Sequence, residues 1–175
     1  YGDYFTWGET QPKSNYDWST YKYCNGSYNT LTKYNNSSSY GTVDNKTTLD
    51  LSDDAARANW GGSWRMPTAA ELIELREQCT WLSTNQNGVN GYKVTSKSNG
   101  NSIFLPAAGY RYDSSLIFAG SYGNYCSSSL YTDTPSRVWN MYFYSGYVGR
   151  SDSRRYYGFS VRPVYGEYVP AINLP

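Results

Sequence analysis

The stretch VWNMYFYSGYVGR, residues 138–150, alternates like a β-hairpin but carries tyrosines where solvent-facing side chains are expected. Successive side chains of a strand face opposite sides of a sheet. One side of the first strand carries Trp139, Met141 and Phe143, and the other side carries Val138, Asn140, Tyr142 and Tyr144. Much of this stretch is aromatic, and charge appears only at its end, so the pattern raises the question of what the exposed rings do.

A two-residue turn at Ser145-Gly146 sets the register of this hairpin. It pairs Tyr144 with Tyr147 and Phe143 with Val148, so that the apolar side continues across both strands. We therefore expect an inward side formed by Trp139, Met141, Phe143 and Val148, and an outward side formed by Tyr142, Tyr144 and Tyr147.

The composition of the chain is unusual for a globular domain. Its 175 residues include 21 Tyr, 6 Trp, 16 Gly and no His, with a net charge of +1. Such a balance gives no reason to expect a nucleic acid as partner. The many Tyr, Ser, Gly and Asn residues resemble the composition of antibody paratopes. No apolar run reaches the ~18 residues of a membrane-spanning helix, so we expect no membrane insertion in this segment.

Three cysteines, Cys24, Cys79 and Cys126, show no zinc-ligand spacing. Their odd number leaves at least one free thiol in a monomer. For Cys24 and Cys79, a disulfide and two buried thiols both remain open.

Local signals predict a mixed α+β domain with few helices and much loop. Residues 3–10 alternate like an early strand, and residues 25–41 are irregular. A short helix is expected to begin near Ser52, with Asp53 and Asp54 at its positive end. A closing strand is expected over residues 159–164.

The clearest helix is PTAAELIELREQC, residues 67–79. Thr68 and Glu71 form a capping box at its start. Its apolar stripe consists of Leu72, Ile73, Leu75 and Cys79. A hairpin around residues 98–100 follows this helix.

Residues 98–166 contain no Lys, Glu or Gln, although roughly ten would be expected at ordinary usage. Arg and Asp do occur there, so charge itself is not excluded. Random change of the two adenines in AAC or AAT codons yields Tyr, Ser, Asp, Gly, Val, Phe and Arg among others, but never Lys, Glu, Gln, Met or Trp. The outward and loop positions of this segment fit that accessible set, whereas the inward Trp139 and Met141 do not.

Three stretches carry a resemblance to a known family: NWGGSWRMPTAAELIEL (residues 59–75), GYKVTSKSNGNSIFLPAAGYR (91–111) and GFSVRPV (158–164). They resemble the major paralogous domain first noted in Fibrobacter and abundant in gut Bacteroidetes and their phages. That domain is similar to the formylglycine-generating-enzyme variant of the C-type lectin fold. The resemblance implies short helices around small antiparallel sheets, and one domain over residues 1–175. Family members often carry Trp where Cys126 stands here.

Many proteins of that family are variable proteins of diversity-generating retroelements, whose reverse transcriptase mutates adenines near the end of the target gene. The resemblance implies a non-catalytic receptor-recognition or adhesion protein, extracellular, on a bacterial cell surface or phage particle. Its partner would be a surface protein or glycan, and no cofactor is expected. The variable binding segment would span about residues 112–157. The candidate ligand-binding residues are Tyr112, Asp113, Ile117, Phe118, Tyr122, Tyr125, Tyr131, Asp133, Thr134, Ser136, Arg137, Val138, Asn140, Tyr142, Tyr144, Tyr147, Gly149, Ser151, Asp152, Ser153, Arg155, Tyr156 and Tyr157.

Other functions fit the sequence less well. The enzyme after which the fold is named uses a reactive cysteine pair, and this sequence shows neither such a pair nor an imidazole base. A calcium-dependent lectin needs converging oxygen ligands, whereas Asp113, Asp133 and Asp152 are scattered. A metal-independent carbohydrate-binding lectin that stacks sugars on tyrosine stays open. A pilus-tip adhesin also stays open, with the C-terminal EYVPAINLP as a short extension.

Overall fold

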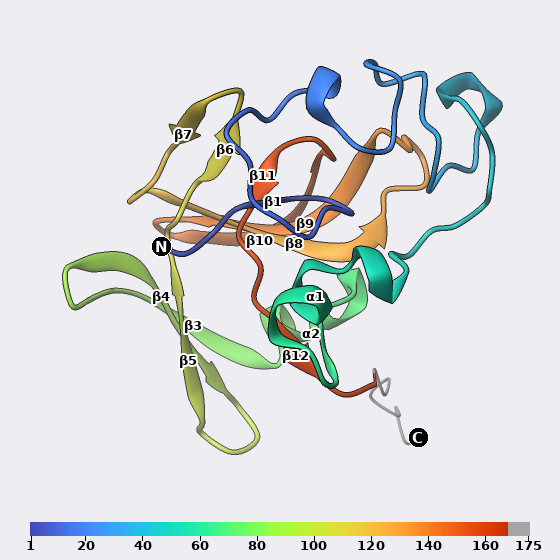
Figure 1. Cartoon of the computed structure of the whole chain (residues 1–175). Coiled ribbons are helices and arrows are strands. Elements are labelled where there is room, and N and C mark those ends of the chain that lie inside the picture. The colour runs from blue at the N-terminus through green and yellow to red at the C-terminus, as the bar shows by residue number, and fades with distance from the viewer. Residues whose placement is uncertain (168–175) are drawn as a thin grey trace.

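The computed structural model describes residues 1–167 and shows a mixed α/β fold dominated by small antiparallel sheets, with few helices (Figure 1). Most of the C-terminal segment EYVPAINLP, from residue 168 onward, lies outside the described residues. A three-stranded sheet occupies the middle of the molecule. The irregular N-terminal segment, residues 1–53, lies on one side of this sheet, and the helix Ala69–Glu77 lies on the other (Figure 1).

The central sheet has the strand order β10-β9-β8. Its strands are β8 (Tyr122–Leu130), β9 (Arg137–Tyr144) and β10 (Tyr147–Arg154). The predicted register is confirmed, because Tyr144 pairs with Tyr147 and Phe143 pairs with Val148. The β8–β9 register shifts between Cys126 and Leu130. An irregularity of that kind bends a strand and increases its twist.

A second three-stranded sheet has the order β3-β4-β5. Its strands are β3 (Cys79–Gln86), β4 (Val89–Ser96) and β5 (Ser102–Pro106). The hairpin predicted around residues 98–100 is confirmed as β4–β5. Strand β3 was not predicted, although Asn87-Gly88 marks its turn. Both residues have positive φ, 51° and 81°, as a tight hairpin turn requires.

Two smaller sheets bring distant parts of the chain together. One has the order β1-β11-β6-β7, and the other pairs β12 with β2. Their strands are β1 (Phe5–Thr6), β11 (Gly158–Phe159), β6 (Tyr110–Tyr112), β7 (Ser115–Ile117), β12 (Val164–Tyr165) and β2 (Trp64–Arg65). The expectation of one closing strand over residues 159–164 was wrong. The chain forms two short strands there because Pro163 has no backbone N–H to donate.

Helix α2 (Ala69–Glu77) begins as predicted, with Thr68 and Glu71 exchanging the two hydrogen bonds of a capping box. It ends at Glu77, so Cys79 begins β3 and does not belong to the helix. Helix α1 (Ala55–Trp60) begins three residues later than expected. Its N-cap is Asp54, whose side chain accepts a hydrogen bond from the backbone of Arg57. Three 3₁₀ turns precede it, at Trp18–Thr20, Ser38–Tyr40 and Leu51–Asp53.

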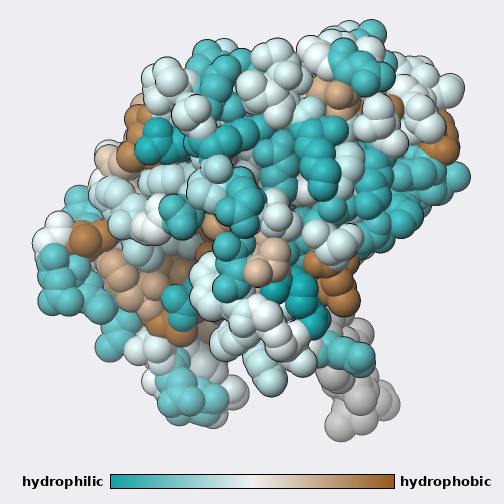
Figure 2. All heavy atoms as spheres, in the orientation of Figure 1, coloured by the Kyte–Doolittle hydropathy of each residue, from teal (hydrophilic) through white to brown (hydrophobic). Residues whose placement is uncertain are grey.

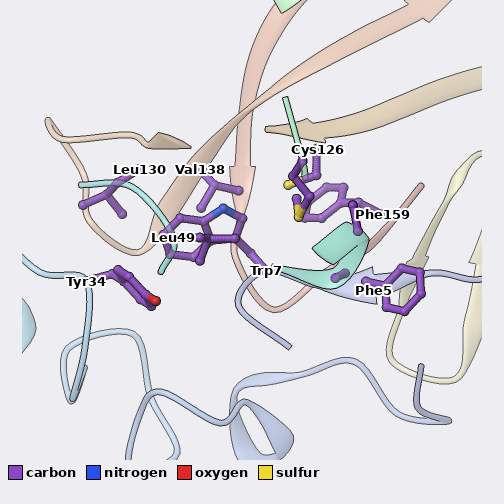
Figure 3. Close-up of a cluster of buried hydrophobic side chains, with 11 residues drawn as sticks. Phe5, Trp7, Tyr34, Leu49, Cys126, Leu130, Val138 and Phe159 are labelled. Carbon is purple, nitrogen blue, oxygen red and sulfur yellow. The ribbon is translucent and has the colours of Figure 1, made fainter. Parts of the chain in front are cut away.

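The core consists of two main clusters, one on each face of the central sheet. On one face, Val138 packs with Trp7 and Tyr34 of the N-terminal segment (Figure 3). On the other face, Met141 and Phe143 pack with Leu72 of α2 and with the β3–β5 sheet. Full burial of each such side chain stabilises the fold by about 1.5–3 kcal/mol.

Two residues of the inward side differ in burial from the others. Met141 and Phe143 are buried, as expected. Trp139 is only half-buried, and its ring contacts Tyr131 at 4.7 Å and the Arg150 guanidinium at 4.8 Å between group centres. Val148 is also half-buried. The inward side is therefore fully covered only in its middle, and Arg150 of β10 lies on the same side, opposite Met141.

All three cysteines lie in the described part of the chain and all are free thiols. Cys126 is fully buried beside Phe159 and Trp7 in the first cluster (Figure 3). Burial raises the pKa of its thiol strongly. Cys126 therefore acts here as a small apolar core residue, in an inert environment.

The surface in Figure 2 shows small, separate hydrophobic areas on one face of the molecule. None of the helices within residues 1–167 combines the length and the apolar character needed to cross a membrane.

Candidate functional site

A continuous row of aromatic rings crosses several strands of the structure. Eight residues form this aromatic ridge, and each ring centroid lies 4.7–6.3 Å from that of the next. In order along the surface they are Tyr147, Tyr144, Tyr142, Tyr122, Phe118, Tyr110, Tyr157 and Tyr112. Their side chains come from β10, β9, β8, β6 and two connecting segments. The fold thus gathers rings that are far apart in the sequence.

Strand register aligns the first part of the aromatic ridge. Tyr144 lies opposite Tyr147 on one side and opposite Tyr122 on the other. The Tyr144 and Tyr147 rings stack at 19° with centroids 5.3 Å apart. Such offset aromatic pairs contribute about 0.5–1.5 kcal/mol beyond the area they bury. The hairpin tip therefore presents its rings as an ordered group.

Glycines leave space beneath the rings at two positions. A Cβ at Gly149 would lie 2.3 Å from the Tyr147 hydroxyl oxygen. A Cβ at Gly123 would lie 2.2 Å from the Phe143 ring, which faces it across the β8–β9 pair. Any larger residue would displace these rings, because real Cβ contacts are longer than this. The two glycines thus allow Tyr147 and Phe143 to lie flat on the strands.

The far end of the aromatic ridge is fixed by backbone contacts. Asp113 follows β6 with a φ of 48°, and its backbone exchanges two hydrogen bonds with that of Tyr16, at 2.9 and 3.0 Å. Phe118, with a φ of 55°, is 55% exposed. Asp is enriched among non-glycine residues with positive φ, whereas a bulky residue such as Phe is rarely found there. This local geometry holds an apolar ring in solvent, a costly arrangement that is common at binding surfaces.

The hydroxyl of Tyr92, on β4, joins the second sheet to the hairpin tip. It donates to the backbone oxygen of Tyr144 at 2.9 Å and accepts from the N–H of Gly146 at 2.9 Å. Tyr92 is buried against Phe143, with ring centroids 5.1 Å apart. The turn of the β9–β10 hairpin is therefore held by a residue outside the predicted variable segment.

The candidate ligand-binding residues fall into three groups by exposure. Those exposed to solvent are Tyr112, Asp113, Phe118, Asp133, Tyr144 and Tyr147. Those half-buried are Ile117, Tyr122, Tyr131, Thr134, Arg137, Tyr142, Ser151, Asp152, Ser153 and Tyr157. Those buried are Tyr125, Ser136, Val138, Asn140, Gly149, Arg155 and Tyr156. The last group does not reach solvent, so the expectation that these seven lie on an exposed face was wrong.

The N-terminal segment explains most of this burial. Val138 is 0% exposed beneath Trp7 and Tyr34. Asn140 is 1% exposed and donates to the Ser153 hydroxyl at 2.7 Å. The outward face of β9 is therefore covered at its base and open only toward its tip.

Arg155 shows the same effect most clearly. It is 0% exposed, and its guanidinium donates to the backbone oxygens of Lys33, Tyr34 and Pro135. It also lies 5.1 Å from the centre of the Trp7 ring. Arg155 thus binds the N-terminal segment to the end of β10 and is a structural residue.

The remaining buried residues have separate reasons. Tyr125 points to the opposite face of β8 from Tyr122 and donates to the Pro106 oxygen at 2.9 Å. Tyr156 is enclosed by the Trp18 ring, 4.9 Å away between centroids. Ser136 lies in the loop between β8 and β9, where its backbone oxygen accepts a hydrogen bond from the backbone N–H of Arg155.

Some surface candidates do not join the aromatic ridge. Tyr131 packs on Trp139, which is on the face of β9 that also carries Met141. Asp152 lies opposite Trp139 in the register and forms an ion pair with Arg137. The structure therefore divides the candidates between the ridge and the base of the hairpin.

Sequence reasoning missed two residues of the site, Tyr110 and Tyr92. Tyr110 alternates with Tyr112 in the stretch YRY, and this period-2 spacing was the available signal. Its ring stacks on Tyr157 at 20°, 5.2 Å away between centroids. Nothing local indicated the role of Tyr92, because its partners are 52 and 54 residues away.

No group of three or more His, Cys, Asp or Glu side chains in residues 1–167 is arranged to hold a metal ion. The aromatic ridge has hydroxyl groups and ring faces as its main chemical features. Such a surface offers contact area and hydrogen bonding.

These features define a small antiparallel α/β domain with an ordered aromatic surface. The chain belongs to a family described as Domain of unknown function (DUF8237), whose model matches residues 77–164. No curated protein and no solved structure matches the chain. The matched range contains the whole aromatic ridge and Tyr92, but not the N-terminal segment that covers the base of the hairpin.

Proposed function

We propose that this chain is a non-catalytic recognition protein that binds a target on a cell or phage surface through its aromatic ridge. The observation that carries the proposal is the continuity of eight rings from separate strands, with Tyr112, Phe118, Tyr144 and Tyr147 exposed. Contiguous exposed apolar patches on soluble proteins commonly mark interaction sites.

Tyrosine suits recognition for physical reasons. It has a large, rigid and amphipathic side chain that loses little rotamer entropy on binding. Residues of this type commonly dominate binding energy at interfaces. The side chains of the aromatic ridge are uncharged. Binding a partner there would therefore not remove water from charged groups of the ridge, which is costly.

The proposal includes diversification of the ridge by a retroelement, on a scaffold of the C-type lectin fold in its formylglycine-generating-enzyme variant. All eight ridge residues lie in the 98–166 segment that has no Lys, Glu or Gln. All are Tyr or Phe, which mutated AAC or AAT codons can encode. The buried Met141 beneath them cannot arise in this way. Small antiparallel sheets with few helices are consistent with such a scaffold.

A matched pair of triple variants tests the recognition role. The ridge variant replaces Tyr112, Tyr144 and Tyr147 by Ser, and these residues are 39%, 36% and 43% exposed. The control variant replaces Tyr1, Tyr28 and Tyr165 by Ser, and these are 55%, 54% and 68% exposed. Labelled proteins are compared on a panel of intact bacterial cells and immobilised surface glycans, with a melting curve for each protein.

Both variants should fold, because exposed substitutions change stability little. The ridge variant should lose binding by a factor of about 30 or more, since hot-spot rings carry ~2 kcal/mol or more. The control should bind like the original chain. If the ridge variant keeps full binding while the control loses it, recognition lies in the N-terminal segment or near β12. Binding should also persist in EDTA, and strong calcium dependence would instead favour a calcium lectin.

A further inference from the structure

A cleft of 510 Å³ lies beside the hairpin end of the aromatic ridge. It opens between the β3–β4 hairpin on one side and the tips of β8 and β9 on the other. Tyr122 and Tyr144 belong to both the ridge and the lining of the cleft. The volume falls within the ~300–1,000 Å³ typical of small-molecule sites.

The lining of this cleft contains no charged side chain, and Ser, Thr, Asn, Gly, Ala, Tyr and Phe make up the whole of it. Four further clefts in the described part of the chain all include Asp, Glu, Lys or Arg. A charged ligand would lose hydration in the uncharged cleft without gaining an ionic partner. The lining therefore favours an uncharged ligand.

Apart from the Asn90 carboxamide, the polar side-chain groups of the cleft are hydroxyls. Within residues 1–167, the side chains of Ser83, Ser121 and Ser145 make no hydrogen bond to protein, and neither do the hydroxyls of Tyr122 and Tyr144. Ser83 pairs with Tyr92 across β3 and β4, so it shares the face that is turned toward Phe143. A purely apolar ligand would leave such groups unpaired, at a cost in binding energy.

Aromatic rings supply the apolar part of the same cleft. The rings of Tyr122 and Tyr144 have centroids 5.4 Å apart at an angle of 44°, and the Phe143 ring lies 5.1 Å from that of Tyr92. A pyranose ring has one apolar face of C–H bonds and a rim of hydroxyls. It can place that face on a tyrosine ring and exchange hydrogen bonds with serine and tyrosine hydroxyls.

We propose that this cleft binds an uncharged sugar residue of a surface glycan. The inference rests on the proposed recognition function and names the ligand class of one end of the ridge. Six of the twelve lining residues, including Ser83 and Tyr92, precede the variable segment, and the other six, including Tyr122 and Tyr144, lie within it. One wall of the site is therefore constant, and a changing wall selects among sugars.

Binding to a glycan microarray with neutral, sialylated and sulfated glycans tests the ligand class. The neutral glycan that gives the strongest signal is then titrated calorimetrically into three proteins. These are the original chain and its Ser83→Leu and Gln86→Leu variants. Ser83→Leu fills the cleft from its constant wall. Gln86→Leu adds the same side chain at an exposed position of β3 outside the cleft.

We expect neutral glycans to bind in preference to the acidic ones. Ser83→Leu should weaken the binding of the neutral glycan by about tenfold or more, whereas Gln86→Leu should change it by less than about threefold. Equal binding of acidic and neutral glycans, no glycan binding at millimolar concentration, or full binding by Ser83→Leu would overturn the inference.

The result for cells separates this inference from the proposed function. If no glycan binds but the ridge triple variant still loses cell binding, the ridge recognises a protein and only the sugar site is wrong. If the ridge triple variant keeps cell binding, the proposed function fails whatever the microarray shows.

Discussion

The base and the tip of one strand face behave very differently in this molecule. Val138 and Tyr144 both lie on the outward face of β9, yet Val138 is 0% exposed and Tyr144 is 36% exposed. Trp7 and Tyr34 cover the base, whereas Tyr122, Tyr142 and Tyr147 surround the tip. Alternation determines which side of a strand a residue faces, but the neighbouring layer determines whether that side meets solvent. The segment that we propose to be variable is therefore part buried framework and part exposed surface.

The largest expected effect contrasts the two faces of the tip. Phe143→Ala removes a ring that is 1% exposed and packed on Tyr92 and Tyr125. It should lower the free energy of unfolding by about 3–5 kcal/mol. Tyr144→Ala should cost under ~1 kcal/mol, because its ring is partly in solvent. Chemical denaturation of both variants measures the difference, and equal losses would mean that the faces are not distinct.

Two adjacent arginines sharpen the contrast between base and surface. Arg155→Ala leaves the buried backbone oxygens of Lys33, Tyr34 and Pro135 without a donor. We expect a loss of about 3 kcal/mol in unfolding free energy. Arg154→Ala, at an exposed position next to it, should change stability by less than ~0.5 kcal/mol. A similar small effect for both would show that the N-terminal segment is not held through Arg155.

Acid should destabilise the packing of the N-terminal segment, because it protonates the Asp53 carboxylate. Burial acts to raise the pKa of its carboxyl, but hydrogen bonds from Lys33, Tyr23 and Tyr34 outweigh burial and lower the pKa from 3.8 to about 2. A lowered pKa in the folded state stabilises the protein above pH ~4, and this stability is lost as the pH falls toward 2.

The Asp53 contribution amounts to about 2 kcal/mol. Urea denaturation at pH 6, 4, 3 and 2 should therefore show a smaller acid-induced loss for Asp53→Asn than for the original chain. Identical pH profiles for the two proteins would contradict the role of Asp53.

The smallest expected effect concerns the link between the two sheets. Tyr92→Phe keeps the ring but removes the hydroxyl that bonds Tyr144 and Gly146. The unfolding free energy should fall by about 1 kcal/mol. Tyr147→Phe, which removes an exposed hydroxyl, is the control and should have almost no effect. Hydrogen exchange of the Gly146 amide should become faster only in Tyr92→Phe, and unchanged exchange would show that the turn does not depend on it.

Local rules predicted the elements whose signals are complete within a few residues. The capping box at Thr68 and the register of the hairpin through Ser145-Gly146 both belong to this class. Strand β3 was missed because its turn at Asn87-Gly88 follows a polar stretch without clear alternation. Its two large apolar residues, Trp81 and Leu82, are adjacent, so they lie on opposite faces and give no alternating pattern.

Burial that depends on contacts between residues far apart in the sequence could not be predicted. Arg155 bonds to residues 121 and 122 positions away, and the covering segment has almost no regular structure. A codon-accessible residue type is equally compatible with a buried and an exposed position. For the same reason, Val138, Asn140 and Tyr156 were placed on the binding surface from their types and spacing alone.

The bonds made by Tyr92 have a consequence for evolution of the surface. Its hydroxyl contacts only main-chain atoms of the hairpin turn, the oxygen of residue 144 and the N–H of residue 146. Main-chain atoms stay the same whatever side chain is encoded. Substitutions of the side chains at residues 144 and 145 therefore leave these two hydrogen bonds in place. Sequences that differ at the hairpin tip can all keep the same attachment to Tyr92. Robustness to mutation is in this way built into the attachment itself.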